Sequence, residues 1–298
     1  MRPRQRRRKI AIRRVALHRV ALRRVVVVTL ALGAGIAPLA TAPARGATLS
    51  VRRPFGSVCQ YSHSAPDDPI VAPGQPGVSH LHDFFGNTTT DASSTAESLA
   101  LGATTCRYQS DLAAYWAPAL YADGLKVTPL RAHAYYARRT FAKVQPPPSG
   151  LRIVAGGTAR TVRFTCIVER MPKASASMAR GCPQGAFSIG IKFPDCWNGT
   201  DLDSADHRSH MAYSQDGVCP ATHPVAIARL QLFVAYPAPR PDAALTLASG
   251  ALDSAHADFF NAWDPGFIRA TVDFCLNGRR ERNCAKRVPR ALRDLDRA

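Results

Sequence analysis

The sequence predicts a mainly β fold, namely a single-domain antiparallel β-sandwich or jelly-roll-like body with long disulfide-stapled loops and little helix. Short runs with partial period-two alternation of apolar residues recur along the chain, and turns rich in glycine and proline separate them. No long stretch shows the sustained 3.6-residue apolar period that is typical of an amphipathic helix. A chain of 298 residues is long enough to bury a full core in one domain.

The N-terminus is predicted to be a signal peptide. Its first 24 residues contain eleven Lys or Arg and no acid, and an apolar run over residues 25–32 leads into small residues that end at Ala44. This order of charged, apolar and small segments is typical of secretory leaders. A retained membrane anchor is the alternative, but glycine and proline interrupt the apolar run before it reaches the roughly 20 residues that span a bilayer. We therefore expect cleavage near Ala44 or Ala47, a secreted protein and no stable membrane span.

The formal charge of +18 comes mostly from the two ends of the chain. Removing residues 1–44 takes away eleven positive charges, which leaves +7 (18 − 11) on the mature chain. Eight Lys or Arg and three acids lie in the last 20 residues, so the remaining body is close to neutral. Nucleic-acid binding needs a basic folded surface, and we expect none. The chain is thus divided into a signal peptide (1–44), an entry segment (45–66), a main domain (67–278) and a basic tail (279–298), a solvated end that could contact an acidic envelope polymer.

The cysteines predict disulfide bonds. All eight follow the leader, and an even number in an oxidising compartment suggests four bonds, for which 105 pairings are possible. A zinc–cysteine site is the alternative, but it needs CxxC-like spacing, which the sequence lacks. Pairs that are close in sequence would close short loops. The expected pairs are Cys166 with Cys182, Cys196 with Cys219 and Cys275 with Cys284, which leaves Cys59 with Cys106.

In chain order, a loop follows the entry segment. Residues 67–74 are so rich in proline and glycine that we expect them to run over the surface. In an extended strand after this loop, His80 and His82 would point to one face, about 6.5 to 7 Å apart. Two imidazoles on one face can share a metal ion or an acid/base role. Residues 88–98 are small and polar, which is consistent with a loop or the start of a short helix.

The strands are predicted where β-branched and aromatic residues alternate with polar ones. In the first two, we interpret the aromatic residues as core or sheet packing, with a sugar-binding platform as the alternative. The predicted strands cover residues 111–121, 132–140, 151–156, 161–168, 187–193, 226–236 and 244–248.

Two later segments are rich in site-capable side chains. In residues 196–224, His207 and His210 are three apart and share a face if their segment is a helical turn. In residues 253–264, His256 and Asp258 are two apart, so one strand face could present both. These segments and the His80–His82 pair form three separate candidate contributions to one site.

Several motifs resemble a known family. They are DPIVAPG (68–74), SHLHDFFG (79–86), FPDCWNG (193–199), the run from Asp203 to Tyr213, CPATHPV (219–225) and HADFFN (256–261). In this order they are similar to the secreted domain-of-unknown-function family numbered nineteen ninety-six, which occurs in actinomycetes and fungi, the fungal members often with a WSC module. Asn198 stands where aspartate is frequent and Ala262 where glycine is frequent, so we do not assign Asn198 as a catalytic carboxylate. The resemblance implies a location and a site but no reaction.

Six of the histidines lie in these motifs, and we expect at least four of them to converge in one cleft. Separate structural roles, such as capping loops or bonding buried carbonyls, are the alternative. The candidate catalytic residues are His80, His82, Asp203, Asp206, His207, His210, His256 and Asp258, and the candidate substrate-binding residues are Arg208, Tyr213, His223, Asn261 and Trp263.

Two classes of function fit these residues. The first is a polysaccharide-active enzyme, either a hydrolase that uses two of these carboxyls as acid and base or a lyase. In a lyase, a histidine with Tyr213 would remove a proton beside a uronate carboxylate and Arg208 would neutralise that carboxylate. The second is a non-catalytic carbohydrate- or metal-binding envelope protein. GxSxG, P-loop, dinucleotide-binding and HExxH motifs are absent from the sequence.

The metal hypothesis needs imidazole ligands. Imidazole is a good ligand for both Zn²⁺ and Cu²⁺. The expected ligands are His80 and His82 together with His207 or His210.

Overall fold

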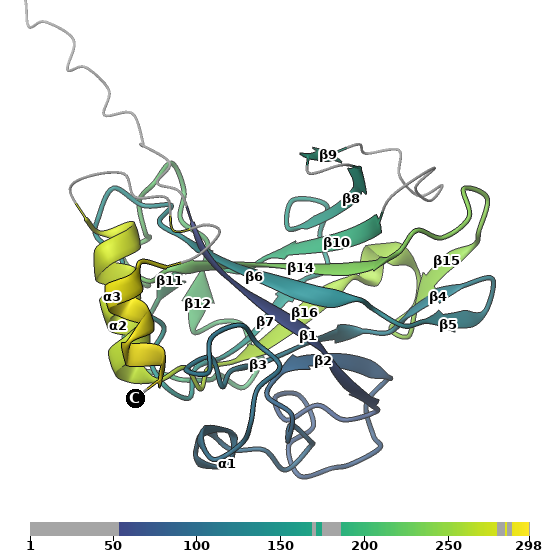
Figure 1. Ribbon diagram of the computed structural model, residues 1–298, viewed down its shortest axis with the longest axis horizontal. Helices are drawn as coiled ribbons and strands as arrows, with labels where there is room; N and C mark the ends of the chain where they lie inside the picture. Colours follow the sequence, from purple (N-terminus) through teal and green to yellow (C-terminus); the bar gives the residue numbers. More distant parts are fainter. Residues whose placement is uncertain (1–53, 169–170, 175–185, 279–283, 285–287, 298) are drawn as a thin grey trace, which may run out of the picture. The chain divides into compact units, whose positions relative to one another are not determined.

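The computed structural model describes residues 54–168, 171–174, 186–278, 284 and 288–297, and it confirms a mainly β, antiparallel fold with little helix (Figure 1). Ten strands form one sheet in the order β7-β16-β3-β2-β1-β6-β14-β10-β8-β9. Their bounds are β1 (Phe55–Ala65), β2 (His82–Gly86), β3 (Ala114–Pro118), β6 (Arg131–Ala137), β7 (Arg152–Gly156), β8 (Val162–Val168), β9 (Met171–Ala174), β10 (Ala186–Lys192), β14 (Arg229–Pro237) and β16 (His256–Phe260).

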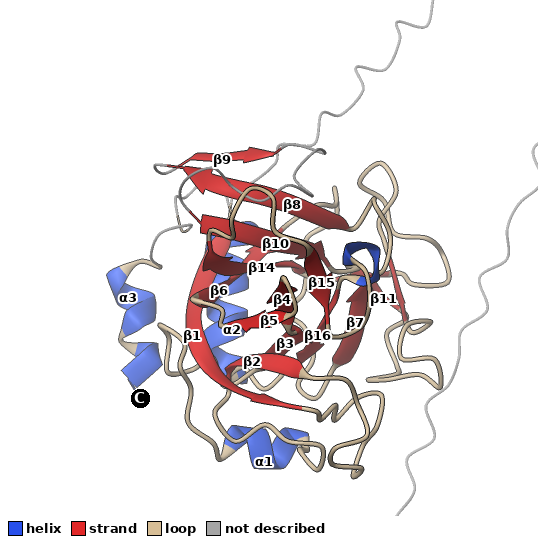
Figure 2. Ribbon diagram, turned by 90° about the vertical axis from the view of Figure 1, so that its right-hand side faces the viewer, coloured by secondary structure: helices blue, strands red, loops and turns tan. Residues whose placement is uncertain are grey.

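The large sheet is strongly curved. It curls into a nearly closed, barrel-like shape, and β10 comes into contact with β7 on the other side of the ring (Figure 2). A twisted antiparallel sheet of this many strands curls in preference to staying flat. The predicted sandwich therefore differs from the observed body in one respect, because the two opposing walls belong to one continuous sheet.

Two small sheets and several short helices complete the described fold. One small sheet contains β11 (Cys196–Trp197), β12 (Met211–Ala212) and β13 (Val225–Ala226), and the other β4 (Leu120–Ala122), β5 (Leu125–Val127) and β15 (Leu245–Leu247). The helical segments are α1 (Ala96–Ala100), α2 (Pro265–Thr271), α3 (Arg290–Arg293), the 3₁₀ turns η2 (Leu252–Ser254) and η4 (Leu295–Arg297), and the π-helical turn η3 (Val272–Leu276).

The inside of the curled sheet is an aromatic core with a polar network at its centre. The Trp263 indole donates to the Tyr136 hydroxyl over 2.9 Å, and the Tyr115 and Tyr136 hydroxyls lie 2.7 Å apart. Tyr115 in turn donates to the Asp111 carboxyl over 3.0 Å. All four side chains are buried, so these aromatics pack in the core as expected. Their polar atoms are satisfied by one another, which keeps the cost of burying them low.

The outer face of the same sheet carries a second, smaller core. Phe84, Trp116, Val154 and Phe260 point outward and pack against the segment between β2 and β3, including Leu99 of α1. Because side chains alternate along a strand, the outward positions of β2 and β16 also include a histidine and an aspartate from the predicted site. This outer core therefore forms the floor on which the site is built.

Both ends of the described chain belong to the body. The predicted entry segment contains β1, which pairs with β2 on one side and β6 on the other. In the predicted tail, the Val288 amide donates to the Tyr108 hydroxyl over 3.0 Å, and the Ser110 amide donates to Asp296 over 2.8 Å. The expectation of a solvated tail is thus wrong for its described part, because these polar contacts and the buried Leu292 fasten it to the domain.

Three of the four predicted disulfides are present. Cys59 is bonded to Cys106, Cys196 to Cys219 and Cys275 to Cys284. The fourth predicted pair includes Cys182, which lies outside the described residues. The predicted leader also lies outside them and stays a prediction. Among the helices that the structure describes, none is both long and apolar enough to cross a membrane.

Asp111→Asn tests the buried carboxyl of the core network. Burial raises the pKa of Asp111 from 3.8 to about 7, so between these values the folded state keeps a proton that the unfolded state has released. This group therefore lowers the stability of the wild-type protein by about 2 to 4 kcal/mol as the pH rises from about 4 to about 7. The Asn variant keeps an acceptor for Tyr115 and should lack this loss. Urea unfolding at both ends of the range measures it, and a stability difference between the two proteins that does not change with pH would contradict the prediction.

Candidate metal centre

Three neighbouring strands place the first ligands on one face. His82 pairs with Pro118 across the β2–β3 ladder, and Asp258 pairs with Trp116 across the β3–β16 ladder. Since the second ladder is antiparallel, His256 lies level with Pro118 on the far side of β3. Residues two apart share a face, so His82, His256 and Asp258 all point outward beside the small outer core.

The loop before β2 brings the remaining groups over these strands. The Ser79 amide donates to the Pro66 carbonyl over 3.1 Å, which closes the loop at its base. Within it, one carboxylate oxygen of Asp68 accepts from the Ile70 and Val71 amides, each over 2.9 Å. This turn holds the buried Asp68 carboxylate in place. His80 follows at the end of the loop and lies against His82.

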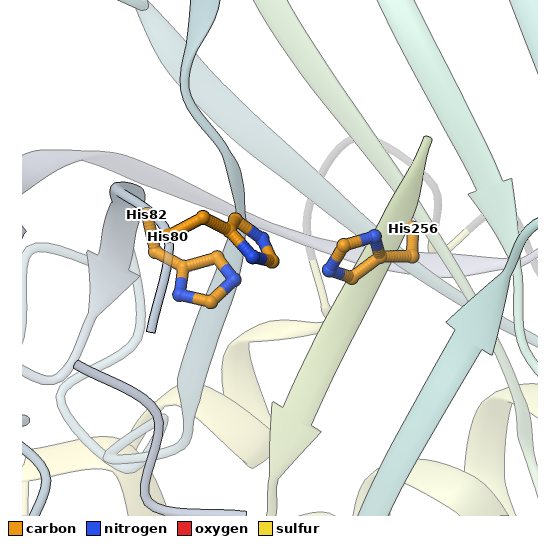
Figure 3. Close-up of side chains that lie close together, drawn as sticks. All are labelled: His80, His82 and His256. Atoms are coloured by element: carbon orange, nitrogen blue, oxygen red, sulfur yellow. The ribbon is translucent and has the colours of Figure 1, made fainter. Parts of the chain in front are cut away.

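The three imidazoles meet in one cluster. A nitrogen from each of His80, His82 and His256 lies within 4.8 Å of the other two, and Figure 3 shows His80 and His82 side by side with the His256 ring opposite. Ring centroids are 4.2 Å apart for His80 and His82 and 5.1 Å apart for His80 and His256. A second group, Asp68, His82 and Asp258, meets the same 4.8 Å limit. His82 is therefore the common member of a five-residue donor set.

Backbone contacts determine which nitrogen of each ring faces the cluster. The Nδ1 of His82 contacts the Asp67 carbonyl over 2.9 Å, and the Nδ1 of His256 contacts the Ser254 carbonyl over 2.9 Å. A carbonyl only accepts, so Nδ1 carries the proton in both rings and Nε2 is left as the acceptor. This arrangement is typical of metal-binding histidines, whose second nitrogen donates to a carbonyl or carboxylate.

Several buried polar atoms in the cluster have no hydrogen-bond partner among the residues that the structure describes. They are the Nε2 atoms of His80 and His82 and both carboxylate oxygens of Asp258. Leaving such atoms unpaired in an apolar surrounding costs free energy. A cation bound among them would satisfy all four atoms, so the residues fit a metal ion.

The pKa shifts of these side chains also favour the binding of a cation. Burial, followed by the neighbouring His80 ring, lowers the pKa of His82 to about 3, so its imidazole is neutral at physiological pH and free to act as a ligand. Burial also lowers the pKa of His256. Burial and then the Asp68 charge raise the pKa of Asp258 well above its usual range. The site thus presents neutral imidazoles together with two close carboxyl groups.

The other predicted histidines lie elsewhere. The Nδ1 of His207 contacts Asp203 over 3.0 Å, and Arg152 lies 3.6 Å from the same carboxylate. His210 is buried, and its two nitrogens contact the Ser204 hydroxyl and the Arg152 carbonyl over 2.9 and 2.7 Å. The expectation that at least four histidines share one cleft is therefore not met. In the structure, His256 takes the ligand position that the sequence suggested for His207 or His210.

His223 and Asp206 stabilise loops. His223 bridges the Thr222 hydroxyl and the Ser209 carbonyl, each over 2.9 Å. Asp206 accepts from the amides of Arg208 and Ser209, and these contacts, the Ser209 amide first, lower its pKa. An exposed, stabilised carboxylate of this kind is a poor proton donor, so the predicted acid/base pair of Asp203 and Asp206 has no support in the geometry.

Two of the predicted substrate-binding residues are buried. The Asn261 amide donates to the Pro147 and Pro148 carbonyls over 3.0 and 2.8 Å, and Trp263 is 1% exposed within the core. Tyr213 and Arg208 are exposed, and the Tyr213 hydroxyl donates to the Lys192 carbonyl over 2.9 Å. Tyr213, Arg208 and the half-buried His223 are therefore the predicted substrate-binding residues that lie near the surface.

The comparisons with known proteins locate the centre within a family. The family model that matches residues 68–263 is described as Domain of unknown function (DUF1996), and this match confirms the resemblance that the motifs indicated. No curated protein and no solved structure matches the chain. All five members of the donor set lie within the matched stretch, which begins at Asp68.

Asp258→Asn tests whether the centre is strained without a cation. The buried, unpaired carboxylate should destabilise the metal-free protein near neutral pH, so the neutral isostere is expected to raise the free energy of unfolding by about 1 to 3 kcal/mol. Urea unfolding in the presence of a chelator measures this change. The matched control is Asp206→Asn, which removes an exposed carboxylate that its loop stabilises and should lower stability. A change of the same sign in the free energy of unfolding of both variants would contradict the prediction.

Proposed function

Because this chain belongs to DUF1996, a family of domains of unknown function, we propose its function from the chemistry of the centre. The domain is a metal-dependent, polysaccharide-active enzyme that holds Zn²⁺ or Cu²⁺ with His80, His82 and His256. The observation that carries this proposal is the meeting of three imidazole nitrogens within 4.8 Å of one another, beside buried acceptors that have no protein partner.

The donor set fits a catalytic rather than a purely structural zinc site in one respect. Catalytic zinc sites have three protein ligands and leave a position for water or substrate, whereas structural sites are closed by four. An ion held by three imidazoles supplies Lewis acidity and lowers the pKa of a bound water to about 7. His80 and His256 are half-buried, so the centre lies close to the surface of the domain.

Asp258 is the residue best placed to move a proton. Its Oδ2 lies 3.9 Å from the Nε2 of His256, and neither of its oxygens has a hydrogen-bond partner within the described part of the chain. Its pKa is raised by burial and by Asp68, and a neighbouring cation would lower it and leave the carboxylate as a base. Asp258 would then accept the proton of the attacking water, as a general base must.

The hydrolase route is better supported than the lyase route. A lyase would need a base such as Tyr213, but desolvation raises the pKa of that hydroxyl to about 12, so at neutral pH almost none of it is the phenolate that could remove a proton. Arg208 is exposed, and its charge acts on His256 and Asp258, so it is placed to bind an anionic sugar group in either reaction. The predicted leader and the disulfides support action outside the cell.

A second candidate function is metal or carbohydrate binding without turnover. It is favoured by the two carboxyls, since Asp68 and Asp258 both lie within 4.8 Å of His82 and of each other. If they occupied the remaining coordination positions, the site would be closed and no position would be left for substrate.

Metal binding is the first test. After chelation, the protein should bind about one Zn²⁺ or Cu²⁺ per chain in a calorimetric titration, and His82→Ala and His256→Ala should weaken binding by about 100-fold or more. His223→Ala is the matched control, because His223 belongs to the same sequence motifs but contacts only its own loop. Absence of stoichiometric binding, or equal loss in the control, would sink the metal proposal.

Turnover separates the two candidate functions. The metal-loaded protein is assayed on neutral and uronate polysaccharides for reducing ends and for the ultraviolet absorbance of unsaturated products. Metal-dependent release of reducing ends without that absorbance is the expected result. Absorbance would show a lyase, and bound metal without any product would favour the binding function.

A further inference from the structure

A pocket of about 470 Å³ opens where the large sheet nearly closes. Its walls come from the turn after β7, the start of β8, the end of β10 and the η2 turn. The polar lining includes Arg160, Arg163 and Lys192, and Phe164 and Leu252 provide apolar surface. The pocket therefore combines cationic groups with apolar patches at one edge of the domain.

Positive charge in this pocket exceeds negative charge. Asp253 is the one carboxylate among the lining residues, and within the described part of the chain no carboxylate lies in ion-pair distance of Arg163 or Lys192. Lys192 also lies near Arg229 and Arg139, whose charges add to that of Arg163 in lowering its pKa after burial. An anion bound here would relieve this repulsion.

Asp195 is the nearby carboxylate that could neutralise the cluster, but it already forms an ion pair with Arg229. Asp195 is fully buried and lies 2.7 Å from Arg229, and it also accepts from Ser214 over 2.8 and 2.9 Å. Its charge therefore balances Arg229 inside the domain and leaves Arg163 and Lys192 to face solvent.

The pocket adjoins the metal centre through the backbone. Gly156 pairs with His256 in the β7–β16 ladder, and the amide of the pocket residue Gly157 donates to the Ala255 carbonyl over 2.8 Å. Gly156 has φ +119°, and a Cβ there would lie 2.5 Å from the Cα of His256. Only glycine permits this close approach, so the turn that lines the pocket is held directly against the strand that carries a metal ligand.

One loop connects the two places and carries a cation near each end. Arg208 acts on Asp258 at the centre, and Tyr213 on the same loop donates to the Lys192 carbonyl at the pocket. The Ser214 hydroxyl beside it accepts from Arg229 over 2.9 Å. The loop thus leads from the exposed Arg208 to Lys192 at the pocket. Charges spaced along a surface suit a polymer with repeated anionic groups better than a single small anion.

We propose that this pocket and its cations bind an acidic polysaccharide. Carboxylate or sulfate groups of the polymer pair with Arg163 and Lys192, and the apolar faces of its sugar rings pack on Phe164 and Leu252. This proposal names the substrate class of the proposed enzyme. It rests on the proposed function in one point only, namely that the polymer bound in the pocket is delivered to the metal centre.

The test measures binding to soluble polymers by affinity electrophoresis and calorimetry. The double variant Arg163→Gln/Lys192→Gln is expected to bind polygalacturonate about tenfold more weakly than the wild-type protein, because two of the paired cations are gone. Lys143→Gln/Arg290→Gln is the control, since it removes the same charge from exposed side chains outside the pocket and should leave affinity unchanged. Arg160→Gln, at an exposed position, gives a second variant of the pocket that does not alter a strand.

The outcomes distinguish the ligand and the two proposals. Dextran sulfate in place of polygalacturonate shows whether sulfate or carboxylate is the preferred group, and weakening of either by the pocket variants supports the site. Equal loss in the control, equal binding of neutral dextran, or tighter binding of single-stranded DNA than of both acidic polysaccharides would overturn it. The binding assay is repeated with chelated protein and with His82→Ala, whose retained polymer binding would support the pocket even if the metal proposal fails.

Discussion

The burial of His82 and Asp258 without protein partners for their acceptor atoms is the constraint around which the outer face is organised. The core network of Asp111, Tyr115 and Tyr136 shows the opposite arrangement, because its buried polar groups satisfy one another. At the centre the protein instead places three imidazoles close together and two carboxyl groups close together, and burial makes both arrangements unfavourable. This arrangement persists because the strand ladders and the loop of Asp68 fix the positions of these side chains.

The curled sheet serves the two faces differently. Its inner face is filled with aromatic side chains and supplies most of the stability. Its outer face supports a small apolar floor, and on this floor the ladders on both sides of β3 bring residues from distant parts of the sequence within reach of one another. The division keeps His82, His256 and Asp258 on rigid strands, where their positions vary little, while the loop before β2 brings Asp68 and His80 over them.

Much of the fold could be predicted from local pattern, because strands such as β10 and β14 alternate with period two and because short cysteine spacings favour local pairs. β1 was assigned to an entry segment, since its place in the middle of the sheet depends on pairing with β2 and β6, which are distant in sequence. Of the centre, the shared face of His80 and His82 was visible from spacing, and so was that of His256 and Asp258.

The remaining site residues show why residue type alone is not enough. His210 looks like a ligand in the sequence, but Ser204 and the Arg152 carbonyl occupy both of its nitrogens. Asp68 was missed because it lies in a proline-rich loop without periodicity, and only the fold of that loop brings it to His82. Its single sequence signal was its position at the start of the first recognised motif. Because the chain is synthesised from its N-terminus, the histidines of the centre also become available at different times. β16 inserts between β3 and β7, and His256 follows His80 by 176 residues (256 − 80). The three imidazoles therefore meet only after long-range sheet closure, which is a slow step in β proteins. A chain that has not yet added β16 to the sheet therefore presents at most two of the three imidazoles, so a metal ion held by all three would be bound only after folding is complete.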